Sequence, residues 1–342
     1  MNHNDGHRRH FLKGAGATAL AMAGASMFNE RAHAASQGTA FPDADAQASV
    51  PLLKVAAGSC DCHVHIFDPQ RYPYTPRRTY TPATASVAML ERFQKKLGMD
   101  RVVLVQPSGY GADNRCLVES LQRLGARARG VAVIDPSTVT LPELEQLHQV
   151  GVRGIRLNLE VKGETNVQVA ADALAAAEKA VLPLGWAIQI YADTRVIVAL
   201  APRLLAMKSP VILDHFGGIK TRDGINDAAF GKLLQILRAG NVYVKLSAPY
   251  RASRQAPDYA DILPFAQALV AAAPHRMVWA SDWPHTGSAS KRSGDLTQVE
   301  AFRAEDAGHT LDLLARWVPD ETTRHQILVD NAAALFDFPR QP

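Results

Sequence analysis

The sequence predicts an α/β protein that folds as a (β/α)8 TIM barrel over residues 52–342. Eight apolar segments rich in β-branched residues recur along this range, and amphipathic stretches separate most of them. Strands that alternate with helical stretches favour a parallel sheet, and eight such strands favour closure into a barrel. The composition is globular, because 47% of the residues are hydrophobic and 20% are charged, which is enough apolar material for a large core.

The elements follow one another with a regular alternation. We expect strands near residues 60–66, 101–106, 129–134, 153–158, 186–191, 211–215, 241–247 and 277–282. Helical periodicity, in which apolar residues recur every three or four positions, predicts helices at Ala85–Leu97, Asn114–Leu124, Leu141–Gln149, Ala170–Ala180 and Asp227–Ala239. The segment from Phe67 to Pro82 is rich in proline and tyrosine and has no such periodicity. It is expected to be either a lid over the active site or a rigid covering strap.

The amino terminus has the pattern of an export signal. The pair Arg8-Arg9 precedes a Gly/Ala-rich stretch, and Ala32-His33-Ala34 is a small-x-small cleavage site. We therefore interpret residues 1–34 as a twin-arginine signal peptide read by the twin-arginine export machinery, and the mature protein is expected in the periplasm. Residues 35–51 are small, polar and proline-bearing, and are expected to form a flexible lead-in. No stretch of the mature chain is long and apolar enough to span a bilayer.

Charge and cysteine content exclude two classes of protein. Removal of residues 1–34 takes away four basic and two acidic residues, so the formal net charge falls from +4 to +2. A surplus this small, without runs of lysine or arginine, argues against binding of nucleic acid. Three cysteines cannot form a fully paired disulfide framework. Cys60 and Cys62 are expected to be buried small hydrophobes on the outer face of the first strand rather than metal ligands.

Three histidines and one aspartate stand at the carboxyl ends of predicted strands, where the active site of a TIM barrel lies. His63 and His65 end the first strand, and side chains at i and i+2 leave a strand on the same face. His215 ends the sixth predicted strand and Asp282 ends the eighth. Three imidazoles and one carboxylate suit a single Zn²⁺ ion, or a metal-free site that polarises a carbonyl group. Asp282 is the expected general base and acid.

Taken together, the motifs resemble the amidohydrolase superfamily, in its amidohydrolase-related (amidohydrolase 2) branch that includes 2-pyrone-4,6-dicarboxylate lactonase and related lactonases. The matching motifs are His-x-His, Gly-x-Arg-x-Asn, Asp-His-x-Gly, Lys-x-Ser-x-x-x-Arg and Ser-Asp-x-Pro-His. The resemblance covers essentially all of Leu53 to Phe338 and implies a metal-dependent-hydrolase-like barrel. It also implies that His63, His65, His215 and Asp282 are catalytic and are the metal ligands if a metal binds. The residues implied to face the substrate are Tyr80, Ser108, Arg156, Tyr191 and Arg251.

The departures from the family pattern narrow these expectations. Members with two metal ions carry further ligands on the fourth and fifth strands, where this chain has Asn158 and Gln189. One divalent ion, zinc above others, or none is therefore expected. In the dicarboxylate lactonase additional arginines bind the two carboxylates of the substrate, and the corresponding positions here are Lys162 and Gly218. The expected substrate is a small anionic lactone: a dicarboxylate, a muconolactone-like compound or a sugar-acid lactone.

Two alternatives to a lactonase remain open. One is a metal-dependent decarboxylase of the same superfamily, although such enzymes usually bring a histidine from the fifth strand. The other is an exported binding protein that has kept the barrel and lost catalysis. The sequence does not identify the oligomeric state.

Overall fold

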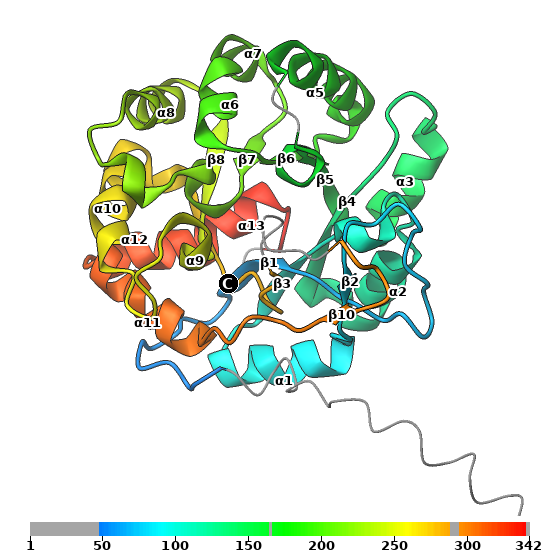
Figure 1. Cartoon of the computed structure of the whole chain (residues 1–342), viewed down its shortest axis with the longest axis horizontal. Coiled ribbons are helices and arrows are strands. Elements are labelled where there is room, and N and C mark those ends of the chain that lie inside the picture. The colour runs from blue at the N-terminus through cyan, green and yellow to red at the C-terminus, as the bar shows by residue number, and fades with distance from the viewer. Residues whose placement is uncertain (1–47, 164–165, 288–293, 340–342) are drawn as a thin grey trace, which may run out of the picture. The chain divides into compact units, whose positions relative to one another are not determined.

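Eight parallel strands form a barrel in the computed structural model, which describes residues 48–163, 166–287 and 294–339 (Figure 1). The strands follow chain order around the barrel. They are β1 (Cys60–Val64), β3 (Arg101–Val105), β4 (Ala128–Ala132), β5 (Val152–Asn158), β6 (Ala187–Tyr191), β7 (Val211–Leu213), β8 (Val242–Ser247) and β9 (Met277–Ala280). Each predicted strand segment overlaps one of them. The predicted TIM barrel is therefore confirmed.

The barrel closes between β1 and the residues that follow β9. Val64 pairs with Trp283 in a parallel bridge. The N–H of Asp282 donates to the carbonyl of His63 at 3.1 Å, and the N–H of His65 donates to the carbonyl of Trp283 at 2.9 Å. Because the closing hydrogen bonds run through these residues, closure of the sheet itself places His63 and His65 beside Asp282.

Helices surround the strands (Figure 1). They are α1 (Val87–Leu97), α2 (Arg115–Leu124), α3 (Leu141–Gln149), α4 (Leu159–Lys162), α5 (Val167–Val181), α6 (Thr194–Ala199), α7 (Ala201–Ala206), α8 (Ala228–Ala239), α9 (Pro249–Ala252), α10 (Leu263–Ala272), α11 (Ala307–Trp317), α12 (Glu321–His325) and α13 (Asn331–Leu335). The five predicted helices correspond to α1, α2, α3, α5 and α8. Among the described residues, no helix combines the length and the apolar character that crossing a membrane would require.

Several helices begin at residues whose side chains cap the free N–H groups of the first turn. At α3, the Thr140 side chain accepts from the N–H of Glu143, and the Glu143 carboxylate accepts from the N–H of Thr140. At α8, Asp227 accepts from the N–H groups of Ala229 and Phe230. Such caps satisfy donors that have no partner within the helix and fix where it starts.

The barrel interior below the active site is a separate apolar cluster that contains Cys60 and Cys62. Its other members are Val103, Val105, Val131, Ala187, Ile212, Val278 and Ala280 from the strands, and Ala332, Leu335, Phe336 and Phe338 from the carboxyl-terminal segment. The cysteines are buried and unpaired as predicted. Their predicted position on the outer face of β1 is wrong, because the pairing of β1 is irregular between Asp61 and Val64. The irregularity breaks the alternation, so Cys62 and His63 both turn inward.

The segment after β1 is an anchored strap, the second of the two expected arrangements. Its end, β2 (Thr81–Pro82), pairs with β10 (Val299–Glu300) in a small parallel sheet. The Tyr74 hydroxyl donates to the carbonyl of Pro82 at 3.2 Å. The Tyr74 ring lies 5.1 Å from that of Tyr110 and 6.2 Å from that of Phe67. The contacts of Tyr74 with Pro82 and Phe67 lie within the strap, whereas its contact with Tyr110 and the pairing of β2 with β10 attach the strap to the rest of the domain.

The predicted lead-in enters the described residues at position 48. The N–H and hydroxyl of Ser49 donate to Asp306 Oδ1 at 2.8 and 3.0 Å. Asp306 is also the N-cap of α11, where it accepts from Gly308 and His309. One carboxylate therefore joins the start of the domain to a helix near its end. The predicted signal peptide, residues 1–34, lies outside the described residues, as does the lead-in up to residue 47.

Candidate active site

His63 and His65 project from the end of β1 toward one point. Their Nε2 atoms lie 3.2 Å apart and their rings are almost perpendicular, at 87°. Both side chains are buried. The two histidines therefore point in the same direction, as the strand geometry predicted.

Asp282 is aimed into the barrel by a strained turn after β9. Its φ of 64° lies in the left-handed region, which is unusual for a residue other than glycine. The preceding residue, Ser281, donates its N–H and its hydroxyl to the carboxylate of Asp61 at 3.0 and 2.5 Å. Asp61 also accepts from Gln94 of α1 at 3.1 Å. This fully buried carboxylate ties β1, β9 and α1 together behind the site and holds the turn in place.

His215 completes a group of four around one carboxylate oxygen. The Nε2 atoms of His63, His65 and His215 lie 3.7, 4.0 and 3.9 Å from Asp282 Oδ1. This oxygen is buried and has no hydrogen-bond partner among the described residues. The structure therefore brings together all four side chains that the sequence analysis named as catalytic, from three distant segments.

The second oxygen of Asp282 is held by α9. The Tyr250 hydroxyl donates to Oδ2 at 2.6 Å, and Arg251 Nε donates to it at 2.8 Å. Burial alone raises the pKa of Asp282, but the charge of Arg251 and the nearby imidazoles outweigh it, and the pKa lies well below its usual range. Asp282 is consequently a carboxylate at neutral pH, with Oδ1 facing the histidines. Tyr250 was not predicted, although it lies inside the Lys-x-Ser-x-x-x-Arg motif.

The histidines are neutral and their outer nitrogens are occupied. His65 Nδ1 lies 2.7 Å from the carbonyl oxygen of Val105, and His215 Nδ1 lies 2.9 Å from Ser247 Oγ. Burial lowers the pKa of His65 to about 4 and that of His215 to about 3. It also lowers the pKa of His63 well below the usual value. The contacts at Nδ1 turn each Nε2 toward Asp282.

A buried ion pair behind His63 was missed by the sequence analysis. Lys245 Nζ lies 3.3 Å from Asp214 Oδ1 and 3.1 Å from His63 Nδ1. Gln189 joins the pair, accepting from Lys245 at 2.7 Å and donating to Asp214 Oδ2 at 2.9 Å. A lysine in the middle of the apolar strand Val242–Ser247 is the sequence feature that marks this network, since a fully buried lysine needs such partners.

Three of the four catalytic candidates, His65, His215 and Asp282, line a cavity of about 1160 Å³. All five residues predicted to face the substrate line it: Tyr80, Ser108, Arg156, Tyr191 and Arg251. Additional cations in its wall are Lys220, Arg222, Arg254 and Arg303. A cavity of this size accommodates a small molecule, and the excess of cations favours an anionic one.

The two predicted substrate arginines differ in how they are engaged. Arg156 is buried and lies 3.6 Å from Asp214 Oδ2, and its Nε has no partner among the described residues. Arg251 is bonded through Nε to Asp282, and its Nη2 also contacts Thr286 at 3.2 Å. Both guanidinium groups lie 5.9 Å from the centre of the Tyr191 ring. Arg156 therefore lines the cavity and keeps one donor without a partner among the described residues, whereas Arg251 already binds Asp282.

Gly218 occupies a position where no side chain fits. Its φ is +72°, and an added Cβ would lie 2.0 Å from the carbonyl oxygen of Ala192. The arginine that the dicarboxylate lactonase pattern would place here is thus excluded by the backbone as well as by the sequence. Two residues later, Lys220 lines the cavity and donates to the carbonyl of Arg251 at 3.1 Å.

The donor set fits one divalent ion. His63, His65 and Asp282 form one group whose ligand atoms lie within 4.8 Å of one another. The Nε2 separation of 3.2 Å between the two histidines is close to the roughly 3.3 Å between two nitrogens bound to tetrahedral zinc. The orphaned Asp282 Oδ1 is the carboxylate ligand of this group. Asn158 and Gln189, on β5 and β6, carry amides where a second ion would need charged or imidazole ligands.

His285 stabilises the turn that carries Asp282 and is not assigned a role at the reacting atoms. Its N–H donates to the carbonyl of Asp282 at 2.8 Å. Its buried Nδ1 has no partner among the described residues, and burial lowers its pKa to about 4. The ring packs 6.1 Å from that of Tyr250.

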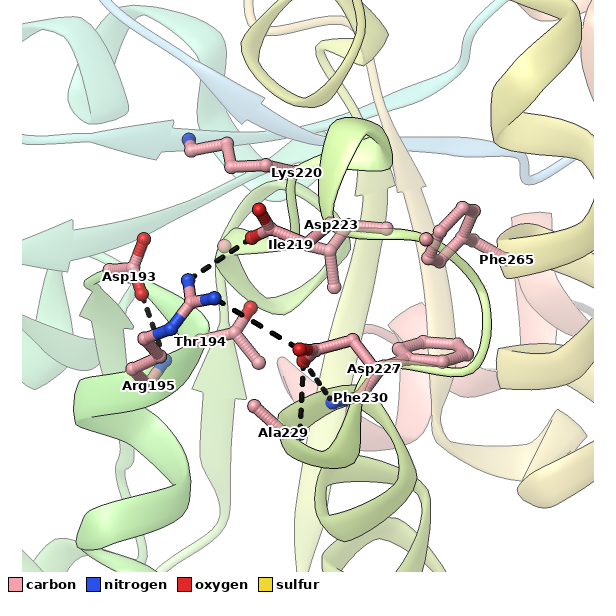
Figure 2. Close-up of a pocket in the computed structure, with 12 residues that line it drawn as sticks. Asp193, Thr194, Arg195, Ile219, Lys220, Asp223, Asp227, Ala229, Phe230 and Phe265 are labelled. Atoms are coloured by element: carbon pink, nitrogen blue, oxygen red, sulfur yellow. Dashed lines mark hydrogen bonds and ion pairs between the residues drawn. The ribbon is translucent and has the colours of Figure 1, made fainter.

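Figure 2 shows a second, much smaller pocket between α6 and α8. Its cavity of about 10 Å³ has room for no more than a single water molecule. Arg195 extends across it and pairs with Asp223 at 3.1 Å and with Asp227 at 4.0 Å (Figure 2). These ion pairs connect the loop after β7 to α6 and α8, so we assign this pocket to structure.

Known proteins resemble this chain in sequence and in fold. A 4-sulfomuconolactone hydrolase from Rhizobium radiobacter is 32% identical over 291 residues, which are 84% of this chain and 93% of the relative. A 2-pyrone-4,6-dicarboxylate hydrolase from Comamonas testosteroni is 33% identical over 301 residues, covering 85% and 94% of the two chains. The crystal structure of an Agrobacterium tumefaciens protein in its apo form superimposes with a TM-score of 0.72 at 28% identity, covering 85% of this chain and 100% of the other.

The family comparison agrees with the site geometry. The model of the family described as amidohydrolase matches residues 60–338, which include every strand of the barrel and all four catalytic candidates. The chain therefore belongs to the amidohydrolase 2 family.

Proposed function

We propose that the protein is a hydrolase that opens a carboxylate-bearing lactone by adding water to its carbonyl group. The observation that carries the proposal is Asp282 Oδ1, an ionised and unpartnered oxygen surrounded by three neutral imidazoles at the floor of a cationic cavity. The two relatives support it, because their names describe hydrolysis of an anionic lactone and of a pyrone dicarboxylate.

In the first step, the lactone carbonyl oxygen lies against the imidazole Nε2 atoms and a water molecule lies against Asp282 Oδ1. The water oxygen bonds to the carbonyl carbon while Oδ1 accepts its proton, and the carbonyl oxygen becomes an oxyanion. An imidazole N–H that faces this oxygen would stabilise the oxyanion. His65 is not that donor, because its single N–H points to the carbonyl of Val105. A zinc ion held by His63, His65, His215 and Asp282 would supply Lewis-acid polarisation of the same oxygen.

In the second step, the ring C–O bond breaks. Asp282, now protonated, returns the proton to the leaving ring oxygen, and the product is an open-chain hydroxy acid. Lactone and water are thus converted into one product, and Asp282 regains its starting state. One carboxylate can serve both steps because Tyr250 and Arg251 hold Oδ2 and leave Oδ1 facing the reacting atoms.

The cavity wall favours a substrate with its own negative charge. Arg156 Nε is a buried donor without a partner among the described residues, and a guanidinium group binds a carboxylate with strong charge-assisted hydrogen bonds. Lys220 adds a second cation at the same cavity. We therefore expect a lactone with at least one carboxylate or another anionic group.

Incubation of the purified protein with a panel of lactones in ¹⁸O-labelled water tests the proposal. We expect a product heavier than the substrate by one water, with ¹⁸O in the new carboxylate. The panel should contain a sugar-acid lactone, a muconolactone and a pyrone dicarboxylate, each with its neutral ester as a matched control. Release of carbon dioxide would indicate a decarboxylase instead. A product with the same mass as the substrate would indicate an isomerase, and binding without turnover would indicate a binding protein.

A further inference from the structure

The charged side chains that line the active-site cavity come from one half of the barrel rim. Among the described residues, the half from β1 to β4 contributes only uncharged groups to the lining: the neutral His65, Tyr80, Pro107 and Ser108. The half from β5 to the segment after β9 contributes the basic residues Arg156, Lys220, Arg222, Arg251, Arg254 and Arg303. A ligand in this cavity therefore meets positive charge on one side and neutral groups on the other.

Three arginines and two tyrosines alternate along the basic half. The guanidinium groups of Arg156 and Arg251 each lie 5.9 Å from the centre of the Tyr191 ring. Those of Arg251 and Arg303 lie 5.3 and 4.6 Å from the centre of the Tyr250 ring. All of these contacts fall within the roughly 6 Å over which a cation and a ring attract each other. The five side chains therefore form one continuous row along the cavity wall, and its two ends are Arg156 and Arg303.

The two ends of this row belong to opposite sides of the barrel. Arg156 lies on β5, the fourth strand in barrel order. The N–H of Arg303 donates to the carbonyl of His285 at 2.8 Å, which attaches Arg303 to the turn after the eighth strand, β9. In a closed barrel of eight strands, the fourth and the eighth are half a circumference apart. Asp282 is bonded to Tyr250 and Arg251, which stand between the two ends.

Arg303 is held in a fixed orientation and keeps a donor for a ligand. Its Nε and Nη2 donate to Glu305 Oε1 at 3.0 and 2.9 Å. Glu305 also accepts from the Tyr259 hydroxyl at 2.6 Å. Arg303 Nη1 has no hydrogen-bond partner in the described part of the chain, and the side chain is 31% exposed. Because the guanidinium group is already oriented by Glu305 and Tyr250, it loses little freedom when it binds an anion.

We propose that Arg303 is a specificity-determining residue that binds a second anionic group of the substrate, across the cavity from Arg156. The substrate then carries two anionic groups, one on each side of the carbonyl group that reacts at Asp282. The dicarboxylate lactonase pattern places an arginine at position 218, where the backbone leaves no room for a side chain. Arg303 provides a contact of the same chemistry from a different segment of the chain. That the ligand is a lactone rests on the proposed function, whereas binding of two anionic groups is measured without a reaction.

Binding of simple dicarboxylates is the direct test. Linear saturated dicarboxylates from succinate to suberate, and monocarboxylates of the same lengths, are titrated into the full chain by calorimetry. We expect one dicarboxylate to bind at least about tenfold more tightly than the monocarboxylate of its length, the scale of one charge-assisted contact. We also expect shorter and longer dicarboxylates to bind more weakly than this one, because the two arginines are a fixed distance apart. Equal affinities of dicarboxylate and monocarboxylate at every length overturn the proposal without any variant.

A matched pair of variants assigns the second contact to Arg303. Arg303→Met removes the guanidinium group at the end of the row. Arg254→Met removes the same charge from the wall of the same cavity, at a side chain that has no hydrogen bond, ion pair or ring contact with the described residues. We expect Arg303→Met to lose the preference for the dicarboxylate and to bind the monocarboxylate as the wild type does, whereas Arg254→Met keeps the preference. A preference that persists in folded Arg303→Met, or that is lost in both variants, contradicts the assignment.

Kinetics separate a contact with the substrate from an effect on Asp282 through the Tyr250 ring. With a hydrolysed lactone that carries two carboxylates, Arg303→Met should raise KM about tenfold and leave kcat unchanged. With the singly charged ester of the same lactone, both constants should stay at the wild-type values. A fall in kcat for both substrates would overturn the proposal, because it would mean that Arg303 acts on Asp282. If no lactone is hydrolysed while the dicarboxylate preference depends on Arg303, the proposed function fails and the assignment of Arg303 stands.

Discussion

Arg251 holds the oxygen of Asp282 that faces away from the histidines, with its Nε and Nη2 each 2.8 Å from Oδ2. This contact leaves Oδ1 free at the centre of the site. It also means that one arginine, predicted from the resemblance to face the substrate, binds the carboxylate that we propose is catalytic.

Asp282→Asn should lower kcat by at least about 10²-fold, the usual contribution of general base catalysis, with little change in KM or in the fold. Asparagine keeps the shape of the side chain and cannot accept a proton from water. Steady-state kinetics on a hydrolysed lactone, with circular dichroism as the folding control, measure this. Turnover close to that of the wild type would show that Asp282 is not the base.

Arg156→Met and Arg251→Met should have different effects. Loss of Arg156 removes a charge-assisted contact of roughly 1.5 to 3 kcal/mol, so KM should rise about 10- to 100-fold for a carboxylate-bearing lactone and much less for its neutral ester. Loss of Arg251 releases Asp282, so kcat should fall for both substrates. Parallel losses on the charged and neutral substrates in Arg156→Met would show that Arg156 is structural.

Metal content should not exceed one ion per chain. Asn158 and Gln189 provide amides where a second ion would require stronger ligands. Elemental analysis of protein purified without chelators measures the ratio of metal to protein. Two tightly bound ions would contradict the assignment of the ligands.

Asp306→Ala should destabilise the protein by about 1 kcal/mol at neutral pH, the typical cost of losing an N-cap. Burial raises the pKa of Asp306, but N–H donors from Ser49, His309 and Gly308 outweigh it and hold the pKa below the usual value. A pKa lowered by folding gives stability that is present above about pH 4, the unfolded value, and is lost as the pH falls through the folded value. Urea unfolding at pH 7 and pH 3 measures the difference in free energy of unfolding between the wild type and Asp306→Ala. We expect this difference to be smaller at pH 3 than at pH 7.

Asp320→Ala is the control for this variant. Asp320 caps the short helix α12 through Thr323 and does not bind the start of the domain. We expect Asp320→Ala to lower the free energy of unfolding by less than Asp306→Ala does. Equal costs would mean that the contact with Ser49 contributes nothing to stability.

Export should depend on the pair Arg8-Arg9. We propose that the mature chain begins near Ala35 and lies in the periplasm, and that Arg8→Lys combined with Arg9→Lys abolishes export. Cell fractionation and amino-terminal sequencing test this. An intact amino terminus on protein recovered from the cytoplasm, with the arginines unchanged, is the contrary outcome.

The sequence by itself determined the barrel and the four residues at its centre. Strands leave a local pattern of apolar, β-branched residues, and a parallel barrel collects the carboxyl ends of its strands at one face. His63, His65, His215 and Asp282 could therefore be placed together without coordinates. The cavity-lining positions of Arg156 and Tyr191 followed from matching motifs in the same way.

Only the tertiary structure decided how these side chains are bonded. The inward position of Cys62 depends on an irregularity in strand pairing, which leaves no periodic pattern in one sequence. The contacts of Lys245 with His63 and of Arg251 with Asp282 join residues on different strands and loops. The physical reason is that hydrogen-bond direction and proton position depend on distances of tenths of an ångström between remote segments. Sequence patterns predict which elements form, whereas these distances are set only when the elements pack.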